Sequence, residues 1–159
     1  MTASILPGEA HALLVVIGKR LERSADTFFK EIDLSAAQFD IMRFLWRQDH
    51  LTLGELSQFC GCAPANITGL VDRLEKKGLL ERSPDPHDRR VARIALTEEG
   101  QKLREPTARI VEKYFAIFQV LEPEDLRVLV ELLKKFYRRL EGQGADAFLE
   151  MLANAGQAS

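Results

Sequence analysis

The sequence is poor in cysteine and has no long apolar run. Its two cysteines, Cys60 and Cys62, are too few for a disulfide framework. The longest apolar stretch, residues 12–17, ends near Lys19 and Arg20 and is far shorter than the roughly 18 residues that span a bilayer. The N-terminus lacks a charged start, an apolar block and a cleavage site, so we predict no secretion signal. These absences predict a cytoplasmic protein without a membrane partner.

Signatures of catalysis and metal binding are also missing. His11, His50 and His87 are scattered and show no metal-ligand spacing. The chain contains no phosphate-binding loop, nucleophile elbow or zinc-protease motif. We therefore expect no enzyme, no metal and no cofactor.

Positive charge is scarce overall but concentrated in the centre. The formal net charge is −2, yet residues 61–95 carry seven Lys/Arg against five Asp/Glu, and both flanks are acidic. Binding to nucleic acid phosphates needs a local basic face rather than a basic chain. The charge pattern is therefore compatible with nucleic acid binding, although it is weak evidence alone.

Two capping boxes divide the first half of the chain. Residues 9–30 have apolar residues at helical spacing. Ser35 with Gln38, and Thr52 with Glu55, each have the spacing at which side chains and backbone amides cap a helix start reciprocally. We predict a helix after each pair, the second one short.

A helix-turn-helix and a hairpin follow. Gly61 breaks the short helix, Pro64 suits the first turn of the next one, and Gly78 suits its end. Residues 79–83 and 91–96 read as strands around a turn-rich segment at 84–88, which predicts a β-hairpin wing. Thr97 should cap the next helix.

The last third is predicted to be helical, with a kink near Pro106, a new helix from Glu122 and a short helix over 145–153. The expected fold class is mainly α with a small β-hairpin wing. Residues 1–34 and 98–159 form a helical dimerisation hub, and residues 35–97 form a winged helix-turn-helix. The amphipathic segments at both ends need a partner surface that one small winged domain cannot supply.

The sequence resembles the MarR family. The resemblance rests on residues 51–56, 66–80 and 85–90 and on Leu96-Thr-Glu-Glu-Gly100, and it covers about residues 9–141. It implies a homodimer that places its second helix-turn-helix helix in a major groove and its wing in the adjacent minor groove. It also implies a transcriptional regulator, usually a repressor, that a small ligand releases from operator DNA. Such ligands, often aromatic or phenolic acids, bind between hub and winged domain.

Candidate DNA contacts lie on the outer face of that second helix and in the wing. Asn66 can pair with an adenine edge, and Thr68 can meet a phosphate or a thymine methyl. The resemblance assigns a paired role to Asp88 and Arg90, with Asp88 orienting the Arg90 guanidinium. Lys76, Lys77, Arg82 and Arg93 are expected as phosphate neighbours. The alternative is that the candidate contact residues only form a solvated surface. The full set of candidate contact residues is Pro64, Ala65, Asn66, Thr68, Gly69, Arg73, Asp88, Arg89 and Arg90.

A candidate effector site contains Phe39, Arg43 and Trp46, with His11 opposite, although Phe39 and Trp46 also suit a plain core. Cys60 and Cys62 invite a thiol switch, but two small buried hydrophobic residues are expected instead. Two further functions stay open. One is a constitutive or architectural DNA-binding dimer without an effector, and the other is a winged helix used for protein–protein contact.

Overall fold

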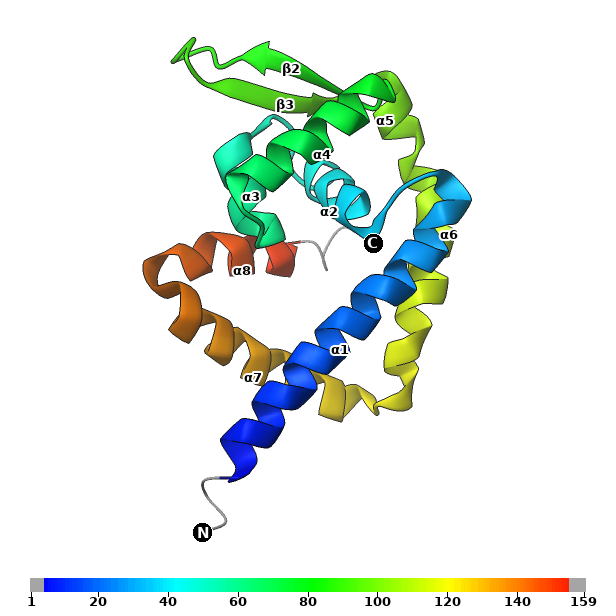
Figure 1. Ribbon diagram of the computed structural model, residues 1–159, viewed down its shortest axis with the longest axis vertical. Coiled ribbons are helices and arrows are strands. Elements are labelled where there is room, and N and C mark those ends of the chain that lie inside the picture. The colour runs from blue at the N-terminus through cyan, green and yellow to red at the C-terminus, as the bar shows by residue number, and fades with distance from the viewer. Residues whose placement is uncertain (1–4, 155–159) are drawn as a thin grey trace.

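The computed structural model describes residues 5–154 and is almost entirely helical around one small sheet (Figure 1). Residues 1–4 and 155–159, the ends of the predicted hub, lie outside the described residues. The predicted fold class, mainly α with a winged helix-turn-helix, is confirmed. In chain order the first elements are α1 (Ile5–Phe29), η2 (Lys30–Ile32), α2 (Ala36–Leu45), β1 (Leu51–Thr52), α3 (Leu53–Cys60), α4 (Pro64–Lys76), β2 (Leu80–Pro84) and β3 (Ala92–Leu96). The remaining elements are α5 (Glu98–Lys102), α6 (Arg104–Phe115), η3 (Ala116–Val120), α7 (Pro123–Glu141), η4 (Gly142–Gly144) and α8 (Ala145–Asn154).

Both predicted capping boxes are present. The Gln38 amide donates to Ser35 Oγ at 3.2 Å, and the Ser35 amide donates to Gln38 Oε1 at 3.0 Å. The Glu55 amide donates to Thr52 Oγ1 at 3.1 Å, and the Thr52 amide donates to Glu55 Oε2 at 2.7 Å. Gly61 ends α3 in the left-handed region at φ +61°, which a residue without a side chain adopts at little cost. The turn of the helix-turn-helix thus lies where the sequence predicts it.

The hairpin forms with a register that pairs Leu80 with Leu96, and its strands begin one residue later than predicted. A third strand, β1, was not predicted. It pairs Leu51 with Ile94 and Thr52 with Arg93, so that the sheet order is β1-β3-β2. Two residues are too few to show the alternation by which strands are recognised in a sequence.

The core lies inside the winged unit. Its largest fully buried side chains come from α2, β1, α3, α4, β2 and β3, and Phe29 reaches it from the end of α1. Phe29 stacks on Phe39 with ring centroids 3.8 Å apart. A hydrogen bond of 2.7 Å from the Ala36 amide to Asp26 Oδ1 makes a second link between α1 and α2. The end of α1 is therefore held against the winged unit.

A close backbone contact joins the end of α4, the start of the hairpin and α5. The Thr97 amide donates to the carbonyl of Leu79 at 3.1 Å, and the Thr97 hydroxyl donates to the carbonyl of Gly78 at 2.6 Å. Gly100 lies against the same Leu79 carbonyl, because a Cβ on Gly100 would sit only 2.1 Å from that oxygen. The Trp46 indole donates to the carbonyl of Gly100 at 2.9 Å, which adds α2 to this joint.

The long helix after the wing is broken near Pro106. Helix α5 ends at Lys102 and α6 begins at Arg104, so the break precedes the proline. A proline ring clashes with the carbonyl four residues earlier, here that of Lys102, and supplies no amide to it. The predicted kink therefore lies one turn upstream of the residue that causes it.

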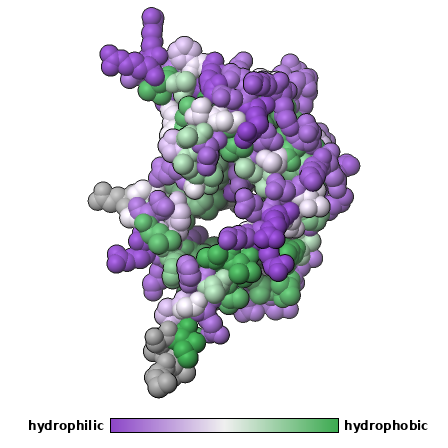
Figure 2. Space-filling model, in the orientation of Figure 1, coloured by the Kyte–Doolittle hydropathy of each residue, from purple (hydrophilic) through white to green (hydrophobic). Residues whose placement is uncertain are grey.

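The hub helices are poorly covered in the single chain. None of the 19 residues of α7, all of which the structure describes, is buried. Exposed large apolar side chains follow α1 from Leu13 to Ile17 and α7 from Val128 to Leu140. Figure 2 shows apolar surface gathered over the lower part of the molecule, where α1 and α7 lie. No helix within residues 5–154 has the length and apolar character needed to cross a membrane.

Candidate nucleic-acid interface

Helix α4 presents one apolar face to the core and one short polar face to solvent. Ile67, Val71 and Leu74 are fully buried, and Leu70 nearly so. The Thr68 hydroxyl donates to the Pro64 carbonyl at 3.0 Å, which leaves its oxygen free to accept. Among the predicted contact residues on α4, the structure exposes Pro64, Ala65, Asn66, Thr68 and Arg73 and half-buries Gly69.

The first turn of α4 is not capped by a side chain. Ala63 occupies the capping position with extended backbone and, unlike Ser35 or Thr52, has no oxygen to accept an amide. Pro64 stands at the first helical position and has no amide to satisfy. The Asn66 amide of this turn donates to the Ala63 carbonyl at 2.9 Å. An amide that a helix start leaves without an internal partner can donate to an outside acceptor such as a phosphate.

The wing is organised by Asp85, which the sequence analysis did not select. Its side chain is only 6% exposed and accepts from the amides of His87 at 2.7 Å and Asp88 at 3.0 Å. Arg93 Nε donates to the second oxygen at 2.5 Å. The His87 amide, the Arg93 guanidinium and the Asp88 amide hold the pKa of Asp85 at about 2. The carboxylate is therefore ionised at any pH at which the protein would meet DNA.

Three cations predicted as phosphate neighbours are engaged inside the protein instead. Arg93 also donates to the carbonyl of His50 at 3.0 Å, which ties the wing to the segment before β1. Arg82 contacts Asp72 at 2.6 Å as well as Glu75, and Lys77 contacts Asp33 at 2.9 Å. Their charges already have partners within the chain, and their place beside DNA phosphates stays a prediction. Within residues 5–154 no ion pair involves Lys76, Arg73, Arg89 or Arg90.

The predicted pairing of Asp88 and Arg90 takes a different form. Asp88 Oδ1 accepts from the backbone amide of Arg90 at 3.0 Å, and the described residues show no ion pair between Asp88 and the Arg90 guanidinium. Asp88 therefore shapes the chain that carries Arg90 rather than its side chain. Asp88, Arg89 and Arg90 are all exposed at the tip.

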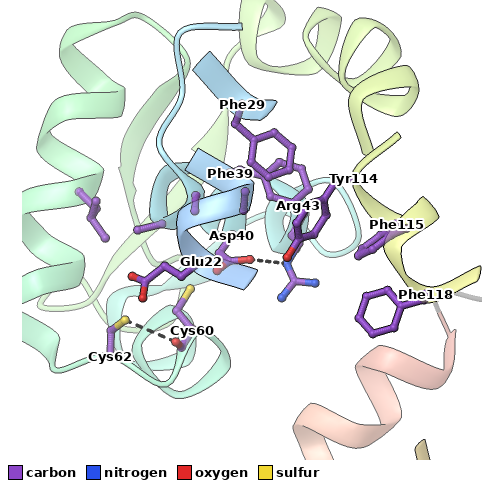
Figure 3. A pocket seen from close by; sticks show the side chains of 14 residues that line it. Glu22, Phe29, Phe39, Asp40, Arg43, Cys60, Cys62, Tyr114, Phe115 and Phe118 are labelled. Carbon is purple, nitrogen blue, oxygen red and sulfur yellow. Dashed lines mark hydrogen bonds and ion pairs between the residues drawn. The ribbon is translucent and has the colours of Figure 1, made fainter. Parts of the chain in front are cut away.

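A cavity of about 460 Å³ lies between α1, α6 and the winged unit. Asp40 and Arg43 form an ion pair of 2.8 Å in its wall. Burial raises the pKa of Asp40, and the charge of Arg43 offsets this in part. In Figure 3 this pair lies between the two cysteines on one side and Phe115 and Phe118 on the other. The lining consists of Glu22, Ala25, Phe29, Ala36, Ala37, Phe39, Asp40, Arg43, Cys60, Cys62, Leu70, Tyr114, Phe115 and Phe118.

A smaller cavity of about 200 Å³ lies on the other side of Arg43 and is basic. Arg43, Arg47 and Arg104 line it together with Phe39, Trp46 and Phe115, and no carboxylate belongs to its lining. Partial burial and the charge of Arg43 lower the pKa of Arg47, as expected where cations are crowded. The structure therefore brings the predicted Phe39, Arg43 and Trp46 together. It places His11 on the exposed part of α1, and His11 lines neither cavity.

The two cysteines, which the sequence predicts to be buried, are free and pack against the core, but each is only partly buried. Both sulfurs line the larger cavity, and Cys62 Sγ lies 3.4 Å from the Cys60 carbonyl. Burial, with the nearby charge of Asp40, raises the pKa of Cys60 to about 12. The same two causes raise the pKa of Cys62. Both thiols are therefore protonated, and poorly nucleophilic, near neutral pH.

These features define a winged-helix DNA-binding transcriptional regulator. The model of the MarR family matches residues 34–92. An uncharacterised HTH-type transcriptional regulator of Bacillus subtilis, YsmB, is 30% identical over 109 residues, which cover 68% of this chain and 75% of YsmB. The chain belongs to the MarR family.

Solved structures of regulators in this family share the fold. Bordetella bronchiseptica BpsR, whose DNA binding is regulated by 6-hydroxynicotinic acid, superposes with a TM-score of 0.72 at 28% identity, covering 79% of this chain and 91% of BpsR. A mutant E. coli MarR complexed with operator DNA superposes with a TM-score of 0.74 at 25% identity, covering 86% of this chain and 97% of that protein. The likeness extends well beyond the segment that matches the family model.

The raised pKa of Cys60 predicts slow alkylation in the folded protein. At pH 8 a thiol of pKa about 12 is ionised about a thousandfold less often than an ordinary cysteine of pKa about 8.5. Iodoacetamide should therefore modify Cys60 far more slowly in native protein than in denaturant, as measured by peptide mass spectrometry. Equal rates in the two states would show that the site does not suppress the thiolate.

Proposed function

We propose that the protein is a homodimeric repressor that binds an inverted-repeat operator and is released by a small aromatic acid. The observation that carries this proposal is the placement of two surfaces. The outer face of α4 and the wing tip lie at one end of the chain, and the uncovered apolar helices lie at the other (Figures 1 and 2). Because its target is DNA, we also propose that the protein acts in the cytoplasm.

Dimerisation follows from the hub. Leu6 is 65% exposed, Phe136 58% and Leu140 73% in the single chain. Contiguous apolar surface of this kind is rare on monomers and marks an association site. A second copy offers the same helices, and a two-fold axis between them would bury both apolar surfaces at once. The two winged units would then carry two copies of α4 on the same assembly.

DNA binding would divide between two elements. Helix α4 has few long donors, since only Asn66, Thr68 and Arg73 carry polar side chains among its candidate residues. Arg89 and Arg90 stand on a tip whose backbone Asp85 and Asp88 fix, and an arginine is favoured in a narrow minor groove. We infer that α4 places the protein in the major groove and that the wing supplies a large share of the affinity.

The effector site would be the basic cavity beside Arg43. Its three arginines suit a carboxylate, and Phe39, Trp46 and Phe115 suit an aromatic ring. The regulation of BpsR by 6-hydroxynicotinic acid, an aromatic acid, supports this ligand class. Because α2 and α6 both line the cavity, a ligand there would contact the winged unit and the hub together. A ligand that changed their relative position would move α4 away from its groove.

Light scattering and a gel-shift titration test the central claim. Native protein should have about twice the 18.0 kDa mass of one chain. It should bind duplexes whose inverted half-sites are about one helical turn, roughly 10 bp, apart. Its affinity should fall steeply as the salt concentration rises, because the release of counterions from DNA then contributes less free energy. A mass near 18.0 kDa, or a flat response to salt, would contradict the proposal. The latter result would favour a protein-binding winged helix.

Replacing Arg90 tests the wing. Arg90→Ala should weaken operator binding by about 1–3 kcal/mol, the range of a good specific contact, and leave the melting temperature unchanged. Asp88→Ala should cause part of the same loss, because the Arg90 amide loses its acceptor. Lys113→Ala, an exposed charge on α6, is the matched control. If Asp88→Ala binds DNA more tightly than the parent, the wing acts only as a patch of charge.

Phenolic and pyridine carboxylic acids test the effector site. Such an acid should raise the melting temperature of the parent and release it from DNA, and Arg47→Ala should lose both responses. The corresponding uncharged amide is the ligand control, and Arg109→Ala, exposed elsewhere on α6, is the variant control. If no acid of this class shifts the melting temperature, the constitutive DNA-binding dimer becomes the better description.

A further inference from the structure

The C-terminal helix α8 folds back onto the winged unit. Ala145 is fully buried, and Leu149 and Met151 are 7% and 8% exposed. Met151 belongs to the same buried cluster as the core of the winged unit. Figure 1 shows α8 lying beside α3, on the side of the winged unit away from α6.

Phe148 connects the hub to the helix-turn-helix. Its ring centroid lies 4.9 Å from that of Tyr137 on α7. On its other side it lies 6.2 Å from the ring of Phe44 on α2 and 6.4 Å from that of Phe59 on α3. One side chain therefore touches a hub helix and two helices of the winged unit.

A hydrogen bond at the start of α8 fixes the same contact. Gln58 Nε2 on α3 donates to the carbonyl of Gly144 at 2.7 Å. A Cβ on Gly144 would lie 2.9 Å from that nitrogen, so the approach needs glycine or a movement of Gln58. On the hub side, Arg138 of α7 lies 3.6 Å from Asp146 of α8.

The other attachments of the winged unit lie elsewhere. The end of α1 meets α2 through Asp26 and Phe29, and α5 leads directly into α6. Ile110 of α6 also packs into the core of the winged unit. A contact at a different helix, α3, restricts the rotation of the winged unit relative to the hub further than these attachments do. Helix α8 supplies this contact at α3, which ends at Cys60 and is separated by three residues from the start of α4 at Pro64.

We propose that α8 is a brace that sets the distance between the two α4 helices of the dimer and so selects operators by the spacing of their half-sites. Phe148 and Gln58 are the positioning residues of this brace. The inference rests on the proposed dimer bound to an inverted repeat. It predicts that loosening the brace changes which spacing is accepted and leaves the half-site sequence unchanged, because neither α4 nor the wing is altered.

Selection from duplexes with a long random segment tests the brace in the full-length chain. The parent should enrich one inverted repeat at one spacing. Phe148→Ala and Gln58→Ala should enrich the same half-sites with a loss of preference for that spacing, so that neighbouring spacings appear. Glu150→Ala, exposed on the same helix, is the matched control and should reproduce the parent.

The variants also separate the possible failures. Gln58→Ala removes the hydrogen bond to Gly144 and leaves the Phe148 ring in place, so it decides the matter if Phe148→Ala does not fold by circular dichroism. Parental spacing in every folded variant overturns the brace. Altered half-site sequence in Gln58→Ala also overturns it, because it would mean that Gln58 reads DNA directly. If the parent itself selects no inverted repeat, the proposed function fails and the brace fails with it.

Discussion

The carbonyl of Leu79 is the point on which the geometry of the DNA-binding end depends. It accepts the Thr97 amide, and Gly100 lies so close to it that no side chain fits there. The end of α4, the first residues of the hairpin and the start of α5 therefore cannot move separately. Trp46 extends this joint to α2. The angle between α4 and the wing is thus fixed by contact between backbone atoms, which can shift far less than flexible side chains can.

The sequence predicted what local chemistry determines. Ser35 with Gln38 and Thr52 with Glu55 define helix starts within four residues, so both could be located before any tertiary contact was known. Strand β1 escaped prediction because two residues carry no period and pair only with a distant strand. The docking of α8 likewise depends on partners such as Gln58, 86 residues away from Gly144 in the chain. The site itself was predicted by family resemblance more than by physics.

The predictions from charged residues in the sequence agreed least with the structure. A basic stretch in a sequence does not show which cations are already paired, and Arg82, Arg93 and Lys77 proved to be engaged by carboxylates from other elements. Asp85 was overlooked because its acceptor role depends on Arg93 and on wing amides that only the folded loop brings to it. Its buried carboxylate accepts hydrogen bonds from two amides and an arginine, and a fully satisfied buried group of this kind makes the loop rigid. Only the folded structure shows which charged side chains are already paired within the protein.

Because no residue of α7 is buried in the single chain, assembly of the proposed dimer would depend on how much of the protein the cell makes. The largest fully buried side chains of the winged unit come from residues 29–94, all of which precede α7 in the chain. In the proposed dimer, helix α7 would gain its burial only when two finished chains meet, so its stability would rise with protein concentration. Chains made in small numbers would stay unassembled for longer and expose these helices to proteases. The concentration of dimer increases as the square of the concentration of monomer. The occupancy of an operator would therefore change more steeply than the rate at which the protein is synthesised.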